Sequence, residues 1–232
     1  MGNLIDLTKK ARIQLDKKQL TDVKAEIVFV VDTSYSMQRL YNNGTVQELV
    51  DRLLGIGMNM DTNKSIDVFS FSDRAREVGK ADERNHTNYV KNNRIITNGG
   101  TKYAPVIRLI MDKYGPAKKG FFNGLFGSKT KKQETPTFVF FITDGDNDDK
   151  NEAEKLIKEA SKQPIFWQFV GIGNTSFSFL QQLDTMSERF LDNANFFQVD
   201  DISAITDDEL YRRLLNEFPG WLQQAKKKGV LH

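Results

Sequence analysis

The chain has 232 residues, and its 33 basic and 31 acidic side chains nearly cancel to a formal net charge of +2. This balance gives no overall positive field, so no nucleic-acid partner is expected, and the lack of cysteine excludes both a disulfide framework and a thiolate metal site. The length suits one large domain, or one domain and an arm, with enough residues to bury a substantial core.

The first 23 residues are predicted to form an N-terminal arm (1–23). Leu4, Leu7, Ala11 and Leu15 recur at helical spacing, which indicates a helix with one apolar face. Residues 11–15 also alternate between apolar and polar, so a short strand stays open as an alternative. The beginning of the chain lacks the apolar stretch of a secretory signal, and no run approaches the roughly 20 apolar residues of a membrane span. We therefore expect a cytoplasmic protein.

Residues 24–218 are predicted to form the main domain, in which β-rich apolar runs alternate with amphipathic helical patterns. The expected strands are 25–31, 66–71, 137–143, 165–172 and 196–199, with a short antiparallel piece at 76–78. The expected helices are 45–60, 103–114, 152–162, 177–186 and 207–218, and a short helix and loop are expected within 86–98. This alternation predicts an α/β fold with a central, mainly parallel sheet and helices on both faces.

Two segments fall outside this alternation. Residues 117–135 contain three phenylalanines and a cluster of lysines, and are predicted to form an insertion or long loop. Its aromatic side chains either contact a partner or an anionic membrane surface, or pack on the body of the domain. Residues 219–232 are predicted to be a basic C-terminal tail.

The apolar run Val28 to Val31 ends in the pattern Asp32-x-Ser34-x-Ser36. A buried parallel strand brings such an aspartate to the carboxyl edge of the sheet, where open α/β folds place their ligands. The turn that follows offers one anionic oxygen and two hydroxyl groups within a few residues. Because all of these ligands are oxygens, they favour Mg²⁺ or Mn²⁺ over zinc.

A similar arrangement recurs downstream. The apolar run Thr137 to Thr143 ends at Asp144-Gly145, and between the two strands Asn98-Gly99-Gly100-Thr101 predicts a glycine-bent loop with a hydroxyl at its end. These three parts, in this order, resemble the von Willebrand factor A (VWA) domain, which has a Rossmann-like fold and a metal-ion-dependent adhesion site (MIDAS). The resemblance implies a site for Mg²⁺, or alternatively Mn²⁺ or Ca²⁺, formed by Asp32, Ser34, Ser36, Thr101 and Asp144.

The resemblance also implies a function. Two carboxylates at neighbouring strand ends repel each other unless a divalent cation lies between them, and neutral hydroxyl groups leave that cation able to attract one more anionic oxygen. In the VWA family a glutamate or aspartate carboxylate of a partner protein supplies it. We therefore expect a metal-dependent protein-binding module and not an enzyme.

A narrower resemblance concerns the opening segment, residues 4–37. It is similar to the region that leads into the A domain of bacterial proteins associated with tellurite and toxic-anion resistance. This similarity implies that the partners are bacterial stress-response proteins.

Three alternatives stay open. Asp32 at the end of a first strand also suits an aspartyl-phosphate phosphatase, although Ser34 stands where that pattern has a second aspartate, so Mg-dependent phosphoryl transfer is the enzymatic alternative. A metal-independent scaffold would bind partners through another face.

The acidic run 146–149 supplies either further metal ligands or the negatively charged start of a helix, and the helix dipole favours the second reading.

Overall fold

The computed structural model describes residues 3–116 and 135–231, which form a six-stranded sheet with the strand order β3-β2-β1-β4-β5-β6. Every neighbouring pair of strands is parallel except β2 and β3, which are antiparallel. This confirms the predicted mainly parallel sheet. The strands are β1 (Glu26–Asp32), β2 (Ser65–Phe71), β3 (Ala75–Asp82), β4 (Thr137–Thr143), β5 (Ile165–Ile172) and β6 (Ala194–Val199).

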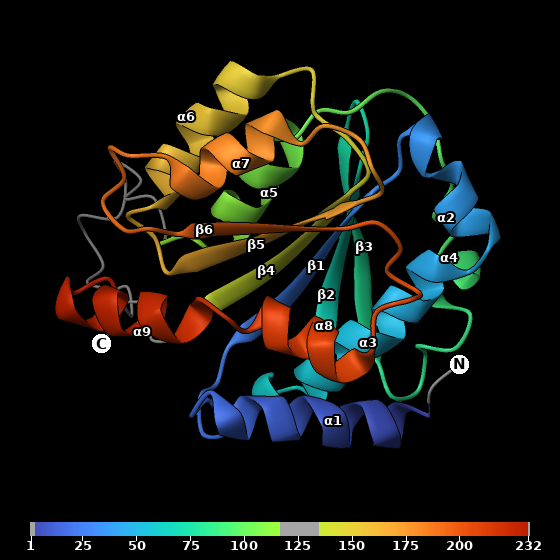
Figure 1. Cartoon of the computed structure of the whole chain (residues 1–232), viewed down its shortest axis with the longest axis horizontal. Coiled ribbons are helices and arrows are strands. Elements are labelled where there is room, and N and C mark those ends of the chain that lie inside the picture. Colours follow the sequence, from blue (N-terminus) through green and yellow to red (C-terminus); the bar gives the residue numbers. More distant parts are fainter. Residues whose placement is uncertain (1–2, 117–134, 232) are drawn as a thin grey trace, which may run out of the picture.

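Helices cover both faces of the sheet, as predicted (Figure 1). One face is covered by α5 (Ala104–Tyr114), α6 (Lys150–Ala160) and α7 (Ser178–Thr185). The other is covered by α3 (Thr45–Met60), α8 (Asp207–Leu214) and α9 (Phe218–Lys227), with α1 (Leu4–Lys17) packed against α3 and α8. Three short helical segments complete the described chain: η1 (Tyr35–Met37), α2 (Gln38–Asn42) and α4 (Tyr89–Asn92).

The central strands are apolar along almost their whole length because both of their faces are buried. In β1, Val28 and Val30 pack with α5 and α6, whereas Phe29 and Val31 enter the core beneath α3. Successive side chains of a strand point to opposite faces, so a two-sided core requires an unbroken apolar run. The same logic applies to β4, whose seven residues are all buried.

The N-terminal arm is a helix, which settles the choice that the local pattern left open. Asn3 caps α1 by accepting a hydrogen bond from the Ile5 amide at 3.1 Å. The helix lies so close to α3 that a β-carbon at Gly55 would stand 3.1 Å from the Leu7 carbonyl. Lys10 also forms an ion pair of 2.9 Å with Asp207 of α8. Tertiary packing on α3 and α8 therefore selects the helix over the strand.

The predicted helix 207–218 is wrong in its last turn. α8 ends at Leu214, and a new helix, α9, begins at Phe218 with Pro219 in its first turn. Proline has no amide proton and its ring clashes with the carbonyl four residues earlier, so it begins a helix but does not continue one. The described part of the predicted tail thus contains α9, which buries Trp221 and Leu222 in the core.

Two further outcomes concern segment lengths. The antiparallel piece predicted at 76–78 is the longer strand β3, which continues past a bulge opposite Val68 where Gly79 adopts a φ of 132°. The predicted loop at 117–135 lies outside the described residues except for its last position. No helix within the described ranges has the length and apolar character needed to cross a membrane.

Candidate metal centre

Two carboxylates lie at the same edge of the sheet because they end neighbouring strands. Asp32 is the last residue of β1, and Asp144 follows the last residue of β4. The two strands are adjacent and parallel, with Val31 opposite Ile142. As predicted, the carboxyl edge therefore brings together side chains that are 112 positions apart in the sequence.

A chain of hydrogen bonds connects the two carboxylates. The Ser34 amide donates to Asp32 Oδ1 at 2.7 Å, which folds the loop into a tight turn. The Ser34 and Ser36 hydroxyl oxygens are 3.1 Å apart, and the Ser36 hydroxyl donates to Asp144 Oδ1 at 2.7 Å. The structure thus brings together Asp32, Ser34, Ser36 and Asp144, four of the five predicted ligands.

The glycine loop joins this group through its backbone. The Asn98 amide donates to the Thr33 carbonyl at 2.7 Å, and the Tyr35 amide donates to the Gly99 carbonyl at 3.4 Å. Gly99 has a φ of 69°, and a β-carbon there would overlap the Asp73 carboxylate, so the position favours glycine.

Thr101, the fifth predicted ligand, is held at the opposite side of the loop. Its carbonyl accepts a hydrogen bond from the Asp148 amide at 2.9 Å, which ties it to the loop after β4. Within the described part of the chain, its hydroxyl makes no hydrogen bond to the other four predicted ligands. The backbone therefore ties Thr101 to the loop after β4, while its side chain is not joined to the hydrogen-bonded group.

Burial makes the two carboxylates difficult to ionise. Asp32 is fully buried, and this raises its pKa to about 6, against the opposing effect of hydrogen bonds from Thr143 and Ser34. Burial also raises the pKa of Asp144, and the hydrogen bond from Ser36 opposes that shift. A divalent cation between the two groups would offset both the desolvation and their mutual repulsion.

The spacing and chemistry of the oxygens fit a hard cation. Around a Mg²⁺ ion with ligands at about 2.1 Å, neighbouring ligand oxygens are about 3 Å apart. The distances of 2.7 and 3.1 Å along the Ser34–Ser36–Asp144 series are close to this value. Within residues 3–116 and 135–231, no group of three or more His, Asp or Glu side chains is arranged so that it could hold a metal ion by itself. The candidate set instead combines two carboxylates with hydroxyl groups.

The acidic run after Asp144 supports the surrounding loops. Asp149 accepts hydrogen bonds from the Tyr103 and Ala104 amides at 2.9 and 2.8 Å, and so caps the beginning of α5. Asp146 pairs with Lys150 at 2.6 Å. The run therefore has a structural role, as the second reading expected, but Asp149 caps the earlier helix α5 and makes no side-chain cap hydrogen bond at the start of α6.

Sequence reasoning missed two supporting residues. Thr143 donates its hydroxyl hydrogen to Asp32 Oδ2 at 2.7 Å, and Tyr103 donates to the Gly145 carbonyl at 2.6 Å. Both are buried beneath the site and fix the loop after β4 against β1. The position of Thr143, directly before Asp144, was a usable signal because a threonine that ends a fully apolar strand requires a buried partner.

This combination of a doubly wound sheet with an oxygen-rich site at its carboxyl edge defines the class of VWA domains. A family model named vWA-TerF-like, described as the "vWA found in TerF C terminus", matches residues 24–231. The chain therefore belongs to the vWA-TerF-like family. The chain is also 39% identical over 233 residues to the uncharacterized protein YcbR of Bacillus subtilis (strain 168), covering 98% of this chain and 90% of YcbR.

Solved structures share the fold at low sequence identity. A von Willebrand factor type A protein from Catenulispora acidiphila is 16% identical, with a TM-score of 0.55 over 85% of this chain and 43% of its own. Proximal thread matrix protein 1 from the mussel byssus is 20% identical in a form with a zinc-occupied MIDAS motif, with a TM-score of 0.51 over 84% of this chain and 48% of its own. This chain spans less than half the length of both.

Proposed function

We propose that this protein is a metal-dependent protein-binding module. Mg²⁺, or Mn²⁺ or Ca²⁺ in its place, would be held by Asp32, Ser34, Ser36, Thr101 and Asp144. The observation that carries the proposal is the hydrogen-bonded series that links the ends of β1 and β4 through two serine hydroxyls. The zinc-occupied MIDAS motif of the mussel protein supports the choice of a divalent cation for this fold.

The carboxylate and hydroxyl ligands have different roles in the proposed site. Asp32 is held rigidly by Ser34 and Thr143, so it supplies fixed negative charge beneath the cation. The hydroxyl groups are neutral ligands that do not cancel the remaining positive charge. When bound, the cation supplies a Lewis-acidic centre for one more anionic oxygen, which we assign to an Asp or Glu carboxylate of a partner protein. Ser36 is exposed, which leaves this side of the site open to a partner.

The phosphoryl-transfer alternative requires Asp32 to act as a nucleophile. Asp32 is fully buried, and each of its carboxylate oxygens accepts a hydrogen bond. A carboxylate in this state is a poor nucleophile, so binding without turnover is the better proposal. The scaffold alternative is distinguished by chelation, because EDTA would leave capture of a partner by a scaffold unchanged.

The family supports a biological setting. The likeness to A domains associated with tellurite and toxic-anion resistance, together with the TerF in the family's description, supports partners in a bacterial stress response. We include cytoplasmic location and a stress-response role in the proposal. The possible membrane contact of residues 117–135 stays a prediction.

Isothermal titration calorimetry with Mg²⁺ and Mn²⁺ tests the metal site. Wild-type protein is expected to bind one cation, and the double variant Ser34→Ala/Ser36→Ala is expected to lose binding. Ser187→Ala removes an exposed serine hydroxyl after α7 and serves as the matched control. Equal heats from wild type and the double variant would contradict the site.

A further inference from the structure

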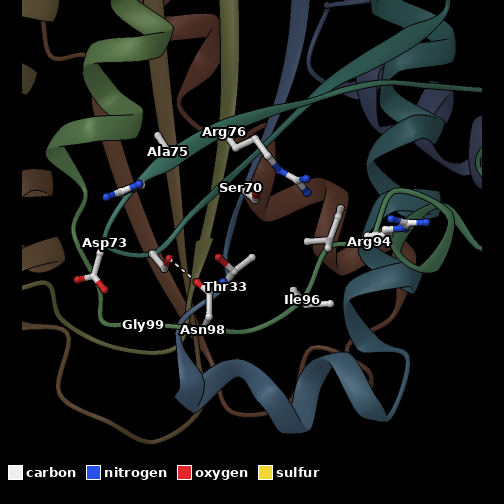
Figure 2. A pocket seen from close by; sticks show the side chains of 12 residues that line it. Thr33, Ser70, Asp73, Ala75, Arg76, Arg94, Ile96, Asn98 and Gly99 are labelled. Carbon is white, nitrogen blue, oxygen red and sulfur yellow. Dashed lines mark hydrogen bonds between the residues drawn. The ribbon is translucent and has the colours of Figure 1, made fainter.

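A pocket of about 570 Å³ lies directly beside the metal loops (Figure 2). Its walls come from the end of β2, the turn that follows, the beginning of β3, and the segment between α4 and α5. Thr33, Asn98 and Gly99 line this pocket and also belong to the loops that form the metal centre. A peptide held by the cation therefore has this pocket as its next contact.

The lining is strongly basic. It contains Arg74, Arg76 and Arg94 against a single acidic residue, Asp73. All three arginines are exposed, and within the described residues none of them forms an ion pair. Asp73 accepts a hydrogen bond from the Gly100 amide at 3.1 Å, and its single negative charge leaves the described lining with a net positive charge.

The arginines retain donors for a ligand. Arg76 donates one hydrogen bond to the Asn93 carbonyl at 3.4 Å, which holds it against the α4–α5 segment and leaves most of its five N–H groups available. Figure 2 shows Arg76 above the pocket, with Asn98 and Gly99 at the opposite end. The arginine and the metal loops therefore bound the same hollow.

The floor of the pocket holds a hydroxyl group that is open to a ligand. Ser70, on β2, lines the pocket, and its hydroxyl makes no hydrogen bond to another described residue and is not among the described polar atoms that are closed off from solvent. It is therefore free to donate a hydrogen bond to a ligand oxygen in the pocket. Ile95 and Ile96 add an apolar wall, and Ile96 is 68% exposed.

Arg94 occupies a backbone position that suits glycine. Its φ is 50°, and its amide donates to the Lys91 carbonyl at 3.1 Å while the Ile95 amide donates to the Val90 carbonyl at 3.0 Å. This is the Schellman motif that ends α4, in which the left-handed residue is usually glycine. An arginine at this position lowers the stability of the folded protein, and it places a guanidinium at the rim of the pocket.

We propose that the partner segment is an acidic peptide, in which one carboxylate binds the cation and neighbouring carboxylates bind the pocket formed by Arg74, Arg76, Arg94 and Ser70. The carboxylate that binds the cation depends on the proposed function. The neighbouring carboxylates bind the arginines of the pocket and do not depend on the cation. Charge complementarity identifies the occupant: three unpaired guanidinium groups beside a cation favour a polyanionic chain over a neutral or basic one.

Two rhodamine-labelled peptides of matched shape test this, EEEGEGEEE and QQQGEGQQQ, which share the central glutamate and differ only in flanking charge. Fluorescence anisotropy in Mn²⁺ is measured for wild type, for Arg76→Ala/Arg94→Gly, and for Arg12→Ala as the control. Arg12 is an exposed arginine on α1, which does not line the pocket. Wild type and control are expected to prefer the acidic peptide by about fivefold or more, and the double variant to lose that preference.

Calorimetry and chelation separate this inference from the proposed function. The double variant is expected to bind Mn²⁺ with wild-type affinity, and its unfolding curve checks that it folds. Arginine-dependent preference for EEEGEGEEE that persists in EDTA supports the pocket and contradicts the metal bridge. EDTA-sensitive binding that is equal in wild type and the double variant contradicts the pocket and supports the metal bridge. Equal affinity of wild type for both peptides, or binding of neither, overturns the acidic-peptide assignment.

Discussion

Two groups of buried charges, one beneath α8 and one at the carboxyl edge of the sheet, are satisfied in opposite ways. On α3, Arg52 is 7% exposed and is surrounded by Glu48 at 2.7 Å, Asp207 at 3.0 Å and the Ile202 carbonyl at 2.8 Å. At the carboxyl edge, hydroxyl groups lie between Asp32 and Asp144, and no basic side chain among the described residues forms an ion pair with either carboxylate. The charge of Arg39 opposes the effect of burial on the pKa of Asp144 but does not overcome it.

The two groups of charges differ in what they contribute to the protein: the first stabilises the fold, whereas the second is the proposed functional site. Around Arg52 the protein supplies both signs of charge itself, so the group holds α8 and α1 to α3. At the carboxyl edge the protein leaves both carboxylates without an ion-paired base among the described residues, and burial raises the pKa of Asp32 as a result. The proposed cation would supply the missing positive charge. Groups that are kept at the expense of stability are typical of functional sites.

The largest change in stability is expected when the group of charges around Arg52 loses its arginine. Arg52→Met should reduce the free energy of unfolding by about 3–5 kcal/mol, because it removes a buried guanidinium that pairs with Glu48 and Asp207 and leaves two carbonyl groups without their donor. Urea denaturation measures this loss. Arg212→Ala on α8 is the control: its arginine pairs with Glu209 at 2.6 Å on the surface and should cost no more than about 1 kcal/mol. Similar losses in the two variants would contradict the contrast.

At the carboxyl edge, removal of a charge is expected to raise the free energy of unfolding instead of lowering it. Asp32→Asn should stabilise the metal-free protein by about 3 kcal/mol at pH 7.5, because a pKa raised from 3.8 to about 6 means that folding disfavours the charged form by that amount. The folded state binds this proton more tightly than the unfolded state. The contribution of Asp32 to the stability of the wild type is therefore greatest below pH 4, falls as the pH rises toward 6, and stays low above it.

Urea denaturation of wild type and Asp32→Asn in EDTA across this range measures the pH dependence. The difference between the two proteins should vanish near pH 4 and reach its full size above pH 6. A variant that is less stable than wild type at pH 7.5 would show that the ionised carboxylate is satisfied by the protein alone.

Metal addition should recover the lost stability. A cation present at 100 times its dissociation constant should raise the free energy of unfolding by about 2.7 kcal/mol, because it binds only the folded state. Thermal unfolding in Mg²⁺ and in EDTA measures the shift. Asp32→Asn and Ser34→Ala/Ser36→Ala should show no shift, and Ser187→Ala should show the full one. A shift of equal size in all four proteins would mean that the cation binds elsewhere.

The smallest expected effect concerns the pocket. Arg94→Gly should stabilise the protein by about 0.5–1 kcal/mol, because glycine adopts the left-handed conformation of this position without steric cost. Arg94→Ala removes the same guanidinium but keeps the strained β-carbon, so its stability should stay near that of wild type. Both variants should weaken binding of the acidic peptide. Destabilisation by glycine would contradict the account of the helix end.

Sequence patterns predicted those features that depend on local periodicity. The apolar runs of β1 and β4 located the buried strands, and the aspartates that follow them located the carboxyl edge, because parallel strands end on one side of a sheet. The end of the last helix was missed even though Pro219 was visible in the sequence. Apolar periodicity continues across the break, whereas the proline determines that a new helix begins.

Other features depend on contacts that no local pattern contains. The arm became a helix through packing of α1 on α3 and α8, which residues 11–15 could not specify. The basic pocket combines Arg74 and Arg76 of the β2–β3 hairpin with Arg94 of a later loop. Only the folded hairpin brings these arginines together, and only the backbone angles reveal that Arg94 stands in a position suited to glycine.

Anomalous diffraction from crystals grown in Mn²⁺ locates the cation itself and therefore decides whether the metal centre exists. We expect one manganese ion at the carboxyl edge, in contact with the hydroxyl oxygens of Ser34, Ser36 and Thr101 and near the carboxylates of Asp32 and Asp144. A manganese ion bound at another place, or none at this edge when Asp32 is ionised, would rule out the proposed metal centre.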